Sequence, residues 1–255
     1  MNAATKAEYE PRARVSDARP VEDRGVVVDA DEGYERWAHV YDDVPNPLLA
    51  REERHLLPAL ADLRDQSALD LACGTGRWLG LFLARGAKVA IGVDRSAAML
   101  GVARGKSRMR QRLVEAACER LPFSNASFDF VVCSFALGHI ADPDALAREI
   151  ARVTRNCADI FVSDLHPDAH AAGWRVGFRE GGSAVQIRTH HRPVEEVAQA
   201  FCSHGFECRA QCSLWLGEPE RFLFDLAGKS NSFTAACGLP AVFVSHFRRE
   251  GEVMR

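Results

Sequence analysis

The sequence predicts an α/β fold in which the strands of a mostly parallel sheet alternate with helices on both faces. An apolar run at 67–71 leads through a glycine-rich turn into an apolar, helix-like stretch at 77–84, which is the order of a strand–turn–helix unit. A second apolar run ends at Asp94, eighteen residues after Gly76. The run Phe128–Ser134 is almost wholly apolar after its second residue, as expected of a strand that is buried on both faces.

Length and composition fit one large domain of this class. The chain has 255 residues, of which 47% are hydrophobic and 26% are charged, as in ordinary globular proteins. The net charge is −3 and no consecutive basic run is longer than Arg248-Arg249, which argues against a nucleic-acid partner. No apolar run is long enough to span a membrane, and the first residues lack the apolar core of a secretory signal. We therefore expect no membrane partner and a cytoplasmic protein.

The eight cysteines indicate no metal site. They form no C-x-x-C pair, and Cys202, Cys208 and Cys212 lack the spacing of zinc ligands. Cysteines in or beside the expected strands behave as small hydrophobic residues. We therefore expect no bound metal.

The N-terminal part is expected to be a tail followed by the domain. Residues 1–32 carry many charges, two prolines and almost no aromatic side chains, so we expect a mobile tail in which only Val26–Val28 is apolar enough to pack. The domain should span 33–255. At its start, one helical face carries Tyr34, Trp37, Ala38 and Tyr41, which either packs on the core or faces a ligand. Residues 46–63 read as a helix that Pro58 divides or kinks.

The remaining elements follow from apolar runs and their caps. Strands are expected at 67–71, 88–94, 112–116, 128–134, 159–162, 207–216 and 241–247. Helices are expected at 76–85, 96–104, 143–153 and 193–204, because serine caps one start and Gly86 and Gly205 follow two ends. An insertion at about 166–192 contains 174–178 and 184–190 around a Gly-Gly turn, which predicts a hairpin that roofs the pocket.

The turn after the first strand predicts an adenosine ligand. Gly74 and Gly76 have no Cβ, so the backbone there can approach a ligand closely. The dinucleotide pattern G-x-G-x-x-G would need a third glycine where Leu79 stands, so no pyrophosphate is expected. Asp94 ends the second strand, where a carboxylate can accept hydrogen bonds from both ribose hydroxyls.

Four segments together resemble the class I S-adenosylmethionine-dependent methyltransferases. They are Asp70-Leu-Ala-Cys-Gly-Thr-Gly-Arg, Gly92-Val-Asp-Arg-Ser with Met99-Leu100, Glu119-Arg-Leu-Pro-Phe, and Phe128-Asp-Phe-Val-Val-Cys-Ser, in the family's order and spacing. The resemblance covers roughly 34–205, and its motif style is closest to the ubiquinone/menaquinone biosynthesis type. It implies a Rossmann-like sheet of seven strands, the last antiparallel, and S-adenosyl-L-methionine as the methyl donor.

The resemblance also implies which residues hold the donor. Asp70 would order the methionine amino group. Asp94 would hold the ribose, and Met99 would pack on the adenine. Where the family usually has an aspartate for the adenine amino group, this chain has Ala117, so the backbone at Cys118 or the side chain of Glu119 takes that place. The full set of expected donor-binding residues is Tyr34, Asp70, Ala72, Gly74, Gly76, Asp94, Arg95, Met99, Cys118, Glu119 and Ser134.

The acceptor side is expected at the ends of the fourth and fifth strands. His139 and His166 follow these strands and are candidates for a general base, with Asp164 orienting His166. Tyr41, Phe135, Trp174 and His190 are expected to contact the acceptor. We expect transfer to carbon or oxygen of an aromatic, quinone-like or specialised small molecule, by a monomer or homodimer. The alternatives are transfer to sulfur, nitrogen or arsenic, and a donor-binding regulatory protein without turnover.

Overall fold

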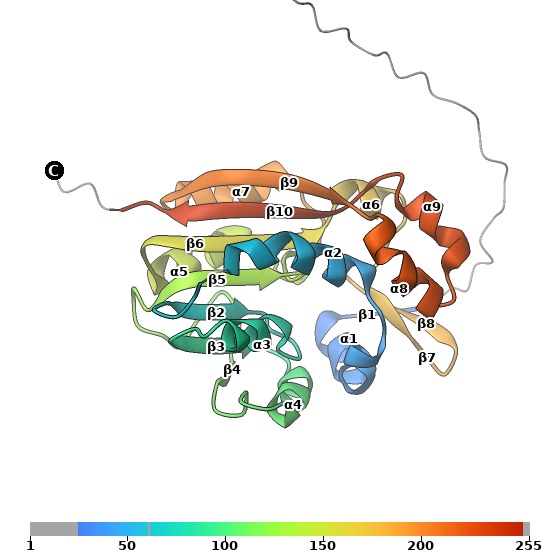
Figure 1. The fold of residues 1–255 in the computed structure, drawn as a ribbon, viewed down its shortest axis with the longest axis horizontal. Helices are drawn as coiled ribbons and strands as arrows, with labels where there is room; N and C mark the ends of the chain where they lie inside the picture. Colours follow the sequence, from blue (N-terminus) through green and yellow to red (C-terminus); the bar gives the residue numbers. More distant parts are fainter. Residues whose placement is uncertain (1–24, 61, 252–255) are drawn as a thin grey trace, which may run out of the picture.

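The computed structural model describes residues 25–60 and 62–251, so most of the expected tail lies outside the described residues (Figure 1). The main sheet has seven strands in the order β4-β3-β2-β5-β6-β10-β9. Its strands are β2 (Ser67–Leu71), β3 (Val89–Asp94), β4 (Leu113–Glu115), β5 (Phe128–Ser134), β6 (Thr154–Leu165), β9 (Phe206–Trp215) and β10 (Pro240–Arg249).

The strand directions confirm the predicted sheet. β4, β3, β2, β5 and β6 pair in parallel, whereas β10 pairs antiparallel with both β6 and β9. The last strand of the chain thus lies between the fifth parallel strand and β9. Because β2, β3 and β5 are adjacent, their carboxyl ends meet at one edge of the sheet, where open α/β sheets bind ligands.

Helices cover both faces of this sheet (Figure 1). On one face, β2 contributes Leu69 and Leu71 to a core that also takes side chains from α5 (Pro143–Val153) and α7 (Val194–Ser203). On the other face, Ala68 packs with α2, α3 and the C-terminal helices. The helices of the described chain, besides α5 and α7, are α1 (Ala30–Trp37), α2 (Pro47–Leu56), α3 (Arg77–Ala84), α4 (Ala97–Gly105), α6 (Pro167–Ala171), α8 (Arg221–Leu226) and α9 (Phe233–Ala236).

Short 3-10 helices complete the described chain: η1 (Ala38–Asp43), η2 (Leu57–Leu60), η3 (Leu137–His139), η4 (Glu218–Glu220) and η5 (Ser230–Ser232). The change from α2 to η2 at Leu57 places the break next to Pro58, as predicted. The helical segment from Glu218 to Ala236 was not predicted from the sequence.

A second, three-stranded sheet packs against α1, and none of its strand residues lines the cavity described below; α1 and η1 line the cavity in place of the expected hairpin roof. The predicted hairpin forms from β7 (Gly177–Glu180) and β8 (Ser183–Ile187), and its Gly181-Gly182 turn has positive φ at both residues. Trp174 precedes the first strand of the hairpin rather than beginning it. β1 (Val26–Val28) pairs in parallel with β8, so residues 26–32 belong to the folded part and not to a tail. The burial of Val28 against Val185 and Ile187 explains this difference.

The three-stranded sheet and the helix after β1 act as one unit, which we call the lid (β1, α1, η1, β7 and β8). Trp37 of α1 stacks on Phe178 of β7, with 5.2 Å between the ring centroids. Arg36 forms a salt bridge with Glu180. These contacts join segments that lie far apart in the sequence, because Arg36 and Glu180 are separated by 144 positions.

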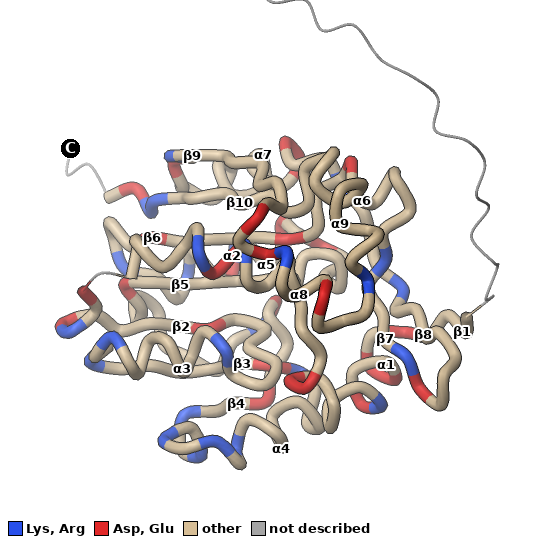
Figure 2. The backbone as a smooth tube through the Cα atoms, turned by 45° about the vertical axis from the view of Figure 1, so that its right-hand side comes forward, with Lys and Arg blue, Asp and Glu red and all other residues tan. Residues whose placement is uncertain are grey.

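Positive charge gathers on the turn between α4 and β4 (Figure 2). Every second residue from 104 to 112 is basic: Arg104, Lys106, Arg108, Arg110 and Arg112. These basic residues alternate with other residues, so the stretch contains no two consecutive basic residues although it is strongly positive. The absence of a nucleic-acid partner therefore stays a prediction. Within the described ranges, no helix has both the length and the apolar character that crossing a membrane requires.

Candidate S-adenosylmethionine site

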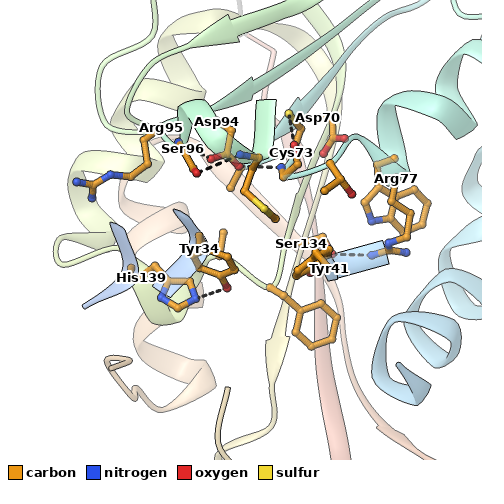
Figure 3. A pocket seen from close by; sticks show the side chains of 18 of the residues that line it. Tyr34, Tyr41, Asp70, Cys73, Arg77, Asp94, Arg95, Ser96, Ser134 and His139 are labelled. Atoms are coloured by element: carbon orange, nitrogen blue, oxygen red, sulfur yellow. Dashed lines mark hydrogen bonds between the residues drawn. The ribbon is translucent and has the colours of Figure 1, made fainter. Parts of the chain in front are cut away.

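A cavity of about 290 Å³ lies between the lid and the carboxyl ends of β2, β3 and β5 (Figure 3). Its lining includes ten of the eleven residues expected to bind the donor, all except Gly76. It also includes Tyr41, Phe135 and His139 from the expected acceptor side. The structure thus brings residues from the lid and from three strand ends to one enclosed space.

The glycine-rich turn has a different role at each glycine. Gly74 lines the cavity in a left-handed conformation, with φ +54°, and its N–H donates to Asp94 Oδ2 at 2.7 Å. Gly76 also has a positive φ, +87°, but it faces Met109: a Cβ there would lie 2.8 Å from the methionine sulfur. The glycine at 76 is therefore explained by packing and backbone conformation.

Asp70 is a buried carboxylate with one oxygen left for a ligand. It is 1% exposed and accepts a hydrogen bond from the Leu79 N–H at 2.8 Å through Oδ2, while its Oδ1 has no hydrogen bond within the described chain. Burial raises the pKa of Asp70 to about 7, although the Leu79 N–H and the nearby Arg77 oppose this rise. A cationic group bound at Oδ1 would favour the ionised form.

Asp94 is held ready at the end of β3. Its two oxygens accept hydrogen bonds from the N–H groups of Gly74 and Ser96, at 2.7 and 2.8 Å. Burial raises its pKa, and these N–H groups oppose the rise. Each carboxylate oxygen still has a lone pair for a further donor, such as a ribose hydroxyl.

The cavity lining includes the side chains that are expected to contact the adenine. Met99 of α4, which is buried, lines the cavity together with Cys118 and Glu119. Arg95 closes this end through a salt bridge of 2.7 Å with Asp31 of the lid. The residues present therefore fit an adenosine group, and Asp70 fits an ammonium group, which together match S-adenosylmethionine.

Tyr34 and His139 form a pair across the cavity. The Tyr34 hydroxyl lies 2.8 Å from His139 Nε2, and the two rings meet edge to face (Figure 3). Burial lowers the pKa of His139 to about 4, with the neighbouring His190 adding to the effect. Burial also raises the pKa of Tyr34. Both side chains are therefore neutral near pH 7.

The other two candidates for catalysis lie elsewhere. His166 is the N-cap of α6: its Nδ1 accepts from the Asp168 N–H at 3.2 Å, and its Nε2 lies 3.1 Å from Ser213 Oγ. It lines a separate cleft between α6, α7 and β9. Asp164 accepts from the Gly138 N–H at 2.7 Å and from the Leu165 N–H at 2.6 Å. It therefore supports the turn that carries His139 rather than orienting His166.

Of the four residues expected to contact the acceptor, two line the cavity and two do not. Tyr41 and Phe135 line the cavity, whereas Trp174 and His190 do not. Trp174 is partly buried against the core on the α2 face of the sheet, and the His190 N–H donates to the Gly138 carbonyl oxygen at 2.7 Å. Phe135 has φ +51°, a strained conformation for a bulky residue, and its N–H is held by the Ser163 carbonyl oxygen at 2.9 Å.

Two polar groups of this site, on Asp42 and Arg77, were not among the predicted residues. Asp42 of the lid accepts a hydrogen bond of 2.6 Å from Thr75 Oγ1 and pairs with Lys106 at 2.7 Å, which closes the lid on the glycine-rich turn. Arg77 lines the cavity and pairs with Glu52, a fully buried carboxylate of α2. Arg77 directly follows the Gly-Thr-Gly motif, and that position was the only sequence signal for it.

Comparisons with known proteins identify similar domains. Residues 69–162 match a family model described as a methyltransferase domain. A demethylmenaquinone methyltransferase of Thermobifida fusca is 35% identical over 115 residues, covering 42% of this chain and 48% of that protein. A malonyl-[acyl-carrier protein] O-methyltransferase of Marinomonas sp. is 28% identical over 187 residues, covering 71% of this chain and 68% of that protein.

A solved structure shows the same fold. The S-adenosylmethionine-dependent methyltransferase of Mesorhizobium loti superposes with a TM-score of 0.60 at 19% identity, covering 77% of this chain and 97% of that one. The chain spans about half the length of several curated relatives that it matches, for example 59%, 48% and 40%. The family match and the shared fold place residues 69–162 among the methyltransferase domains, within a chain that has the class I S-adenosylmethionine-dependent methyltransferase fold.

Proposed function

We propose that the protein transfers a methyl group from S-adenosylmethionine to carbon or oxygen of a small, largely apolar acceptor. The observation that carries this proposal is the single cavity in which donor-type residues, Asp70 and Asp94, meet an aromatic wall formed by Tyr34, Tyr41 and Phe135. The names of two relatives, for demethylmenaquinone and malonyl-[acyl-carrier protein], supply acceptors that can be tried first.

The donor, when bound, supplies a methyl group that its sulfonium activates for in-line displacement. The work of the chain is then to position, to exclude water and to accept a proton. Asp70 would hold the ammonium group and Asp94 the ribose. The lid excludes water, because Tyr34 and Asp42 reach from it to His139 and Thr75.

His139 is the group we assign to the acceptor's proton. Since its pKa is about 4, the ring is neutral near pH 7 and its Nε2 is free to accept a proton through the Tyr34 hydroxyl. The bond between the methyl carbon and the donor sulfur would break as the acceptor bonds to that carbon, and S-adenosylhomocysteine would leave. The proton of the acceptor would pass to the Tyr34 hydroxyl, and the phenol proton to His139 Nε2. The proton then returns to solvent when the lid opens.

The cysteines do not favour transfer through thiolates. Cys73 and Cys118 line the cavity, yet burial raises the pKa of both thiols, so both stay protonated near pH 7. This argues against an arsenic site built from these two residues.

The test compares His139→Ala with His166→Ala. With radiolabelled S-adenosylmethionine and a panel that contains demethylmenaquinone, malonyl-[acyl-carrier protein] and simple phenols, we expect methyl transfer to at least one acceptor. His139→Ala should lower kcat by about 10²–10⁴-fold with donor affinity close to wild type. His166→Ala is the matched control and should stay near wild type, because His166 lies outside the cavity. Wild-type turnover in His139→Ala would remove the proposed base.

A further inference from the structure

A short segment links the inserted hairpin to the turn that carries His139. The turn comprises residues 137–141, and the segment comprises residues 188–192, directly after β8; we call this segment the strap. At its start, the Arg188 N–H donates to the Val28 carbonyl oxygen at 2.9 Å, so the strap leaves from the lid. It leads into α7, which packs on the main sheet. The strap therefore joins the lid to the core of the molecule.

The strap meets the turn at Gly138. The Gly138 carbonyl oxygen accepts from the His190 N–H at 2.7 Å, and the Gly138 N–H donates to Asp164 Oδ2 at 2.7 Å. A Cβ at Gly138 would lie 3.3 Å from the Thr189 side chain, which is a tight contact. Because glycine leaves this space open, the strap and β6 hold the middle of the turn from two sides.

Arg192 of the strap holds both ends of the same turn. Its Nη1 donates to the Leu137 carbonyl oxygen at 3.2 Å, and its Nη2 donates to the Ala141 carbonyl oxygen at 2.6 Å. Its Nε pairs with Glu196 at 3.2 Å, and the arginine side chain is only 12% exposed. A guanidinium is a rigid planar fork of N–H donors, so bonds through all three nitrogens fix its orientation.

These bonds restrain the backbone more than they balance charge. The carboxylate partner, Glu196, is 50% exposed, whereas the two carbonyl oxygens belong to the turn itself. His139 lies between the two bonded positions, and its Nε2 reaches the Tyr34 hydroxyl at 2.8 Å (Figure 3). The position of the imidazole in the cavity therefore depends on a turn that Arg192 fastens at both ends.

We propose that Arg192 is a positioning residue for His139: by bonding both ends of the turn, it holds the imidazole against the Tyr34 hydroxyl. This inference rests on the proposed function, because it takes His139 as the base. The hairpin, whose strands do not line the cavity, then serves methyl transfer by placing the strap on the turn. Misplacing a reacting group by 1 Å can cost about 10²-fold in rate, so loss of this arginine should slow turnover.

The kinetic test compares Arg192→Gln with Arg249→Gln. Arg249 is the matched control, because its guanidinium also bonds two carbonyl oxygens of a turn, those of His204 and Gly205, at 2.8 and 2.7 Å. It ends β10, beside the start of β6 and thus at the sheet edge opposite the cavity. Arg192→Gln should lower kcat by about 10–100-fold, whereas Arg249→Gln should leave it near wild type.

Two further measurements separate positioning from a general loss of structure. The Kd of S-adenosylhomocysteine should stay within about twofold of wild type in Arg192→Gln, because the arginine acts on the base and not on the donor. Arg192→Lys should have an intermediate kcat, since it keeps the charge but cannot bond both ends of the turn in the same way. Melting curves establish that each variant is folded.

A double variant tests whether Arg192 acts through His139. In a His139→Ala background, Arg192→Gln should lower kcat by less than about twofold, since no imidazole is left to position. A general effect on structure would instead lower kcat by the same factor in both backgrounds.

An NMR titration of His139 needs no acceptor. Burial holds the pKa of this histidine at about 4. The charged and titratable groups that face the ring or support its turn come from four elements: Tyr34 of α1, Arg95 after β3, Asp164 of β6 and His190 of the strap. In Arg192→Gln the ring should gain water, so its pKa should rise toward the ordinary value of about 6.5. Wild type and Arg249→Gln should keep the neutral ring down to about pH 5.

The outcomes are distinguishable. Wild-type kcat together with a wild-type titration in Arg192→Gln overturns the assignment. A loss of kcat that is equally large in the His139→Ala background also overturns it, because the arginine then acts on another group. If no acceptor is methylated by the wild-type protein, the proposed function itself fails, and the titration alone decides whether Arg192 positions His139.

Discussion

The side chains that surround the cavity have ionisation behaviour suited to a cationic ligand. Asp70 and Asp94 are buried acids with raised pKa values, and His139 is a buried base with a lowered one. Without a ligand, burial therefore favours the neutral form of each group. A ligand with an ammonium group reverses this preference at Asp70, because the carboxylate is the form that binds it.

Donor affinity should consequently depend on pH. With a pKa of about 7, Asp70 is protonated in most molecules at pH 6 and ionised in most at pH 8. The carboxylate is the form of Asp70 that binds the ligand, and it becomes the main form only as the pH rises through this pKa. The affinity for S-adenosylhomocysteine should therefore increase by about tenfold from pH 6 to pH 8. Calorimetry at several pH values measures this rise.

Asp70→Asn supplies the control for that prediction. It should bind S-adenosylhomocysteine weakly and with little pH dependence between pH 6 and pH 8. Any slope that comes from the ligand's own ammonium appears in both proteins, so the difference between the two pH profiles reports the titration of Asp70. A wild-type affinity that is constant over the same range would show that Asp70 is ionised already or is not in contact with the ligand.

For individual residues, the sequence could predict the position along a strand but not the direction of every side chain. Asp70 and Asp94 line the cavity because the strand ends dictate where they lie. His166 also follows a strand, yet its ring turns away to cap α6 and to bond Ser213. Local competition for an exposed N–H group decided this, and the spacing of residues does not reveal it.

The lid lines one side of the cavity through α1 and η1, and we expect it to control access. Its core is small, with Val28, Trp37, Val185 and Ile187 as the buried residues. Its parallel pairing joins Val26 to Val185, a contact between distant parts of the chain. Such pairing leaves no local pattern in the sequence beyond a short apolar run, which is why the hairpin could be predicted and its third strand could not.

Trp37→Ala should loosen the lid. The tryptophan is 8% exposed and packs on Phe178 and Tyr41, with ring centroids 5.2 and 4.9 Å away, so its removal leaves a cavity under α1. The closed lid should become a smaller fraction of the population, and S-adenosylhomocysteine affinity should fall by about tenfold. Calorimetry measures this loss, and amide exchange should increase in 26–41 and 177–187.

Trp215→Ala is the matched control for that substitution. Trp215 lies on β9 and is 50% exposed, outside the lid. It should leave both affinity and amide exchange of the lid unchanged. An equal loss in both variants would mean that the effect of Trp37→Ala is a general loss of stability and not an opening of the lid.

The whole molecule combines a predictable sheet with additions that distinguish it from a minimal fold. The strands Ser67–Leu71 and Phe128–Ser134 were predicted to the residue, since apolar runs between turn signals define buried parallel strands well. The helices between β9 and β10 were not predicted. Phe224 and Phe233 bury themselves against the core from short helices, which are too short to show a helical period in the sequence.

Because the cavity lies between the lid and the main sheet, a ligand there should stabilise the molecule as a unit. At one hundred times its Kd, a ligand that binds only the folded state adds about 2.7 kcal/mol to the free energy of unfolding. For a chain of this size that corresponds to a rise in Tm of about 5–10 °C, which a thermal-shift assay with S-adenosylhomocysteine measures.

NAD at the same concentration should leave Tm unchanged. The turn at Gly74 is tied to Asp94 at 2.7 Å, and Leu79 stands where a dinucleotide turn needs its third glycine, so the pyrophosphate has no cradle. Asp94→Ala should reduce the shift caused by S-adenosylhomocysteine, because the ribose loses its carboxylate partner. An equal Tm rise with NAD would mean that the cavity recognises adenosine alone, and the assignment of Asp70 to the methionine ammonium would then lose its support.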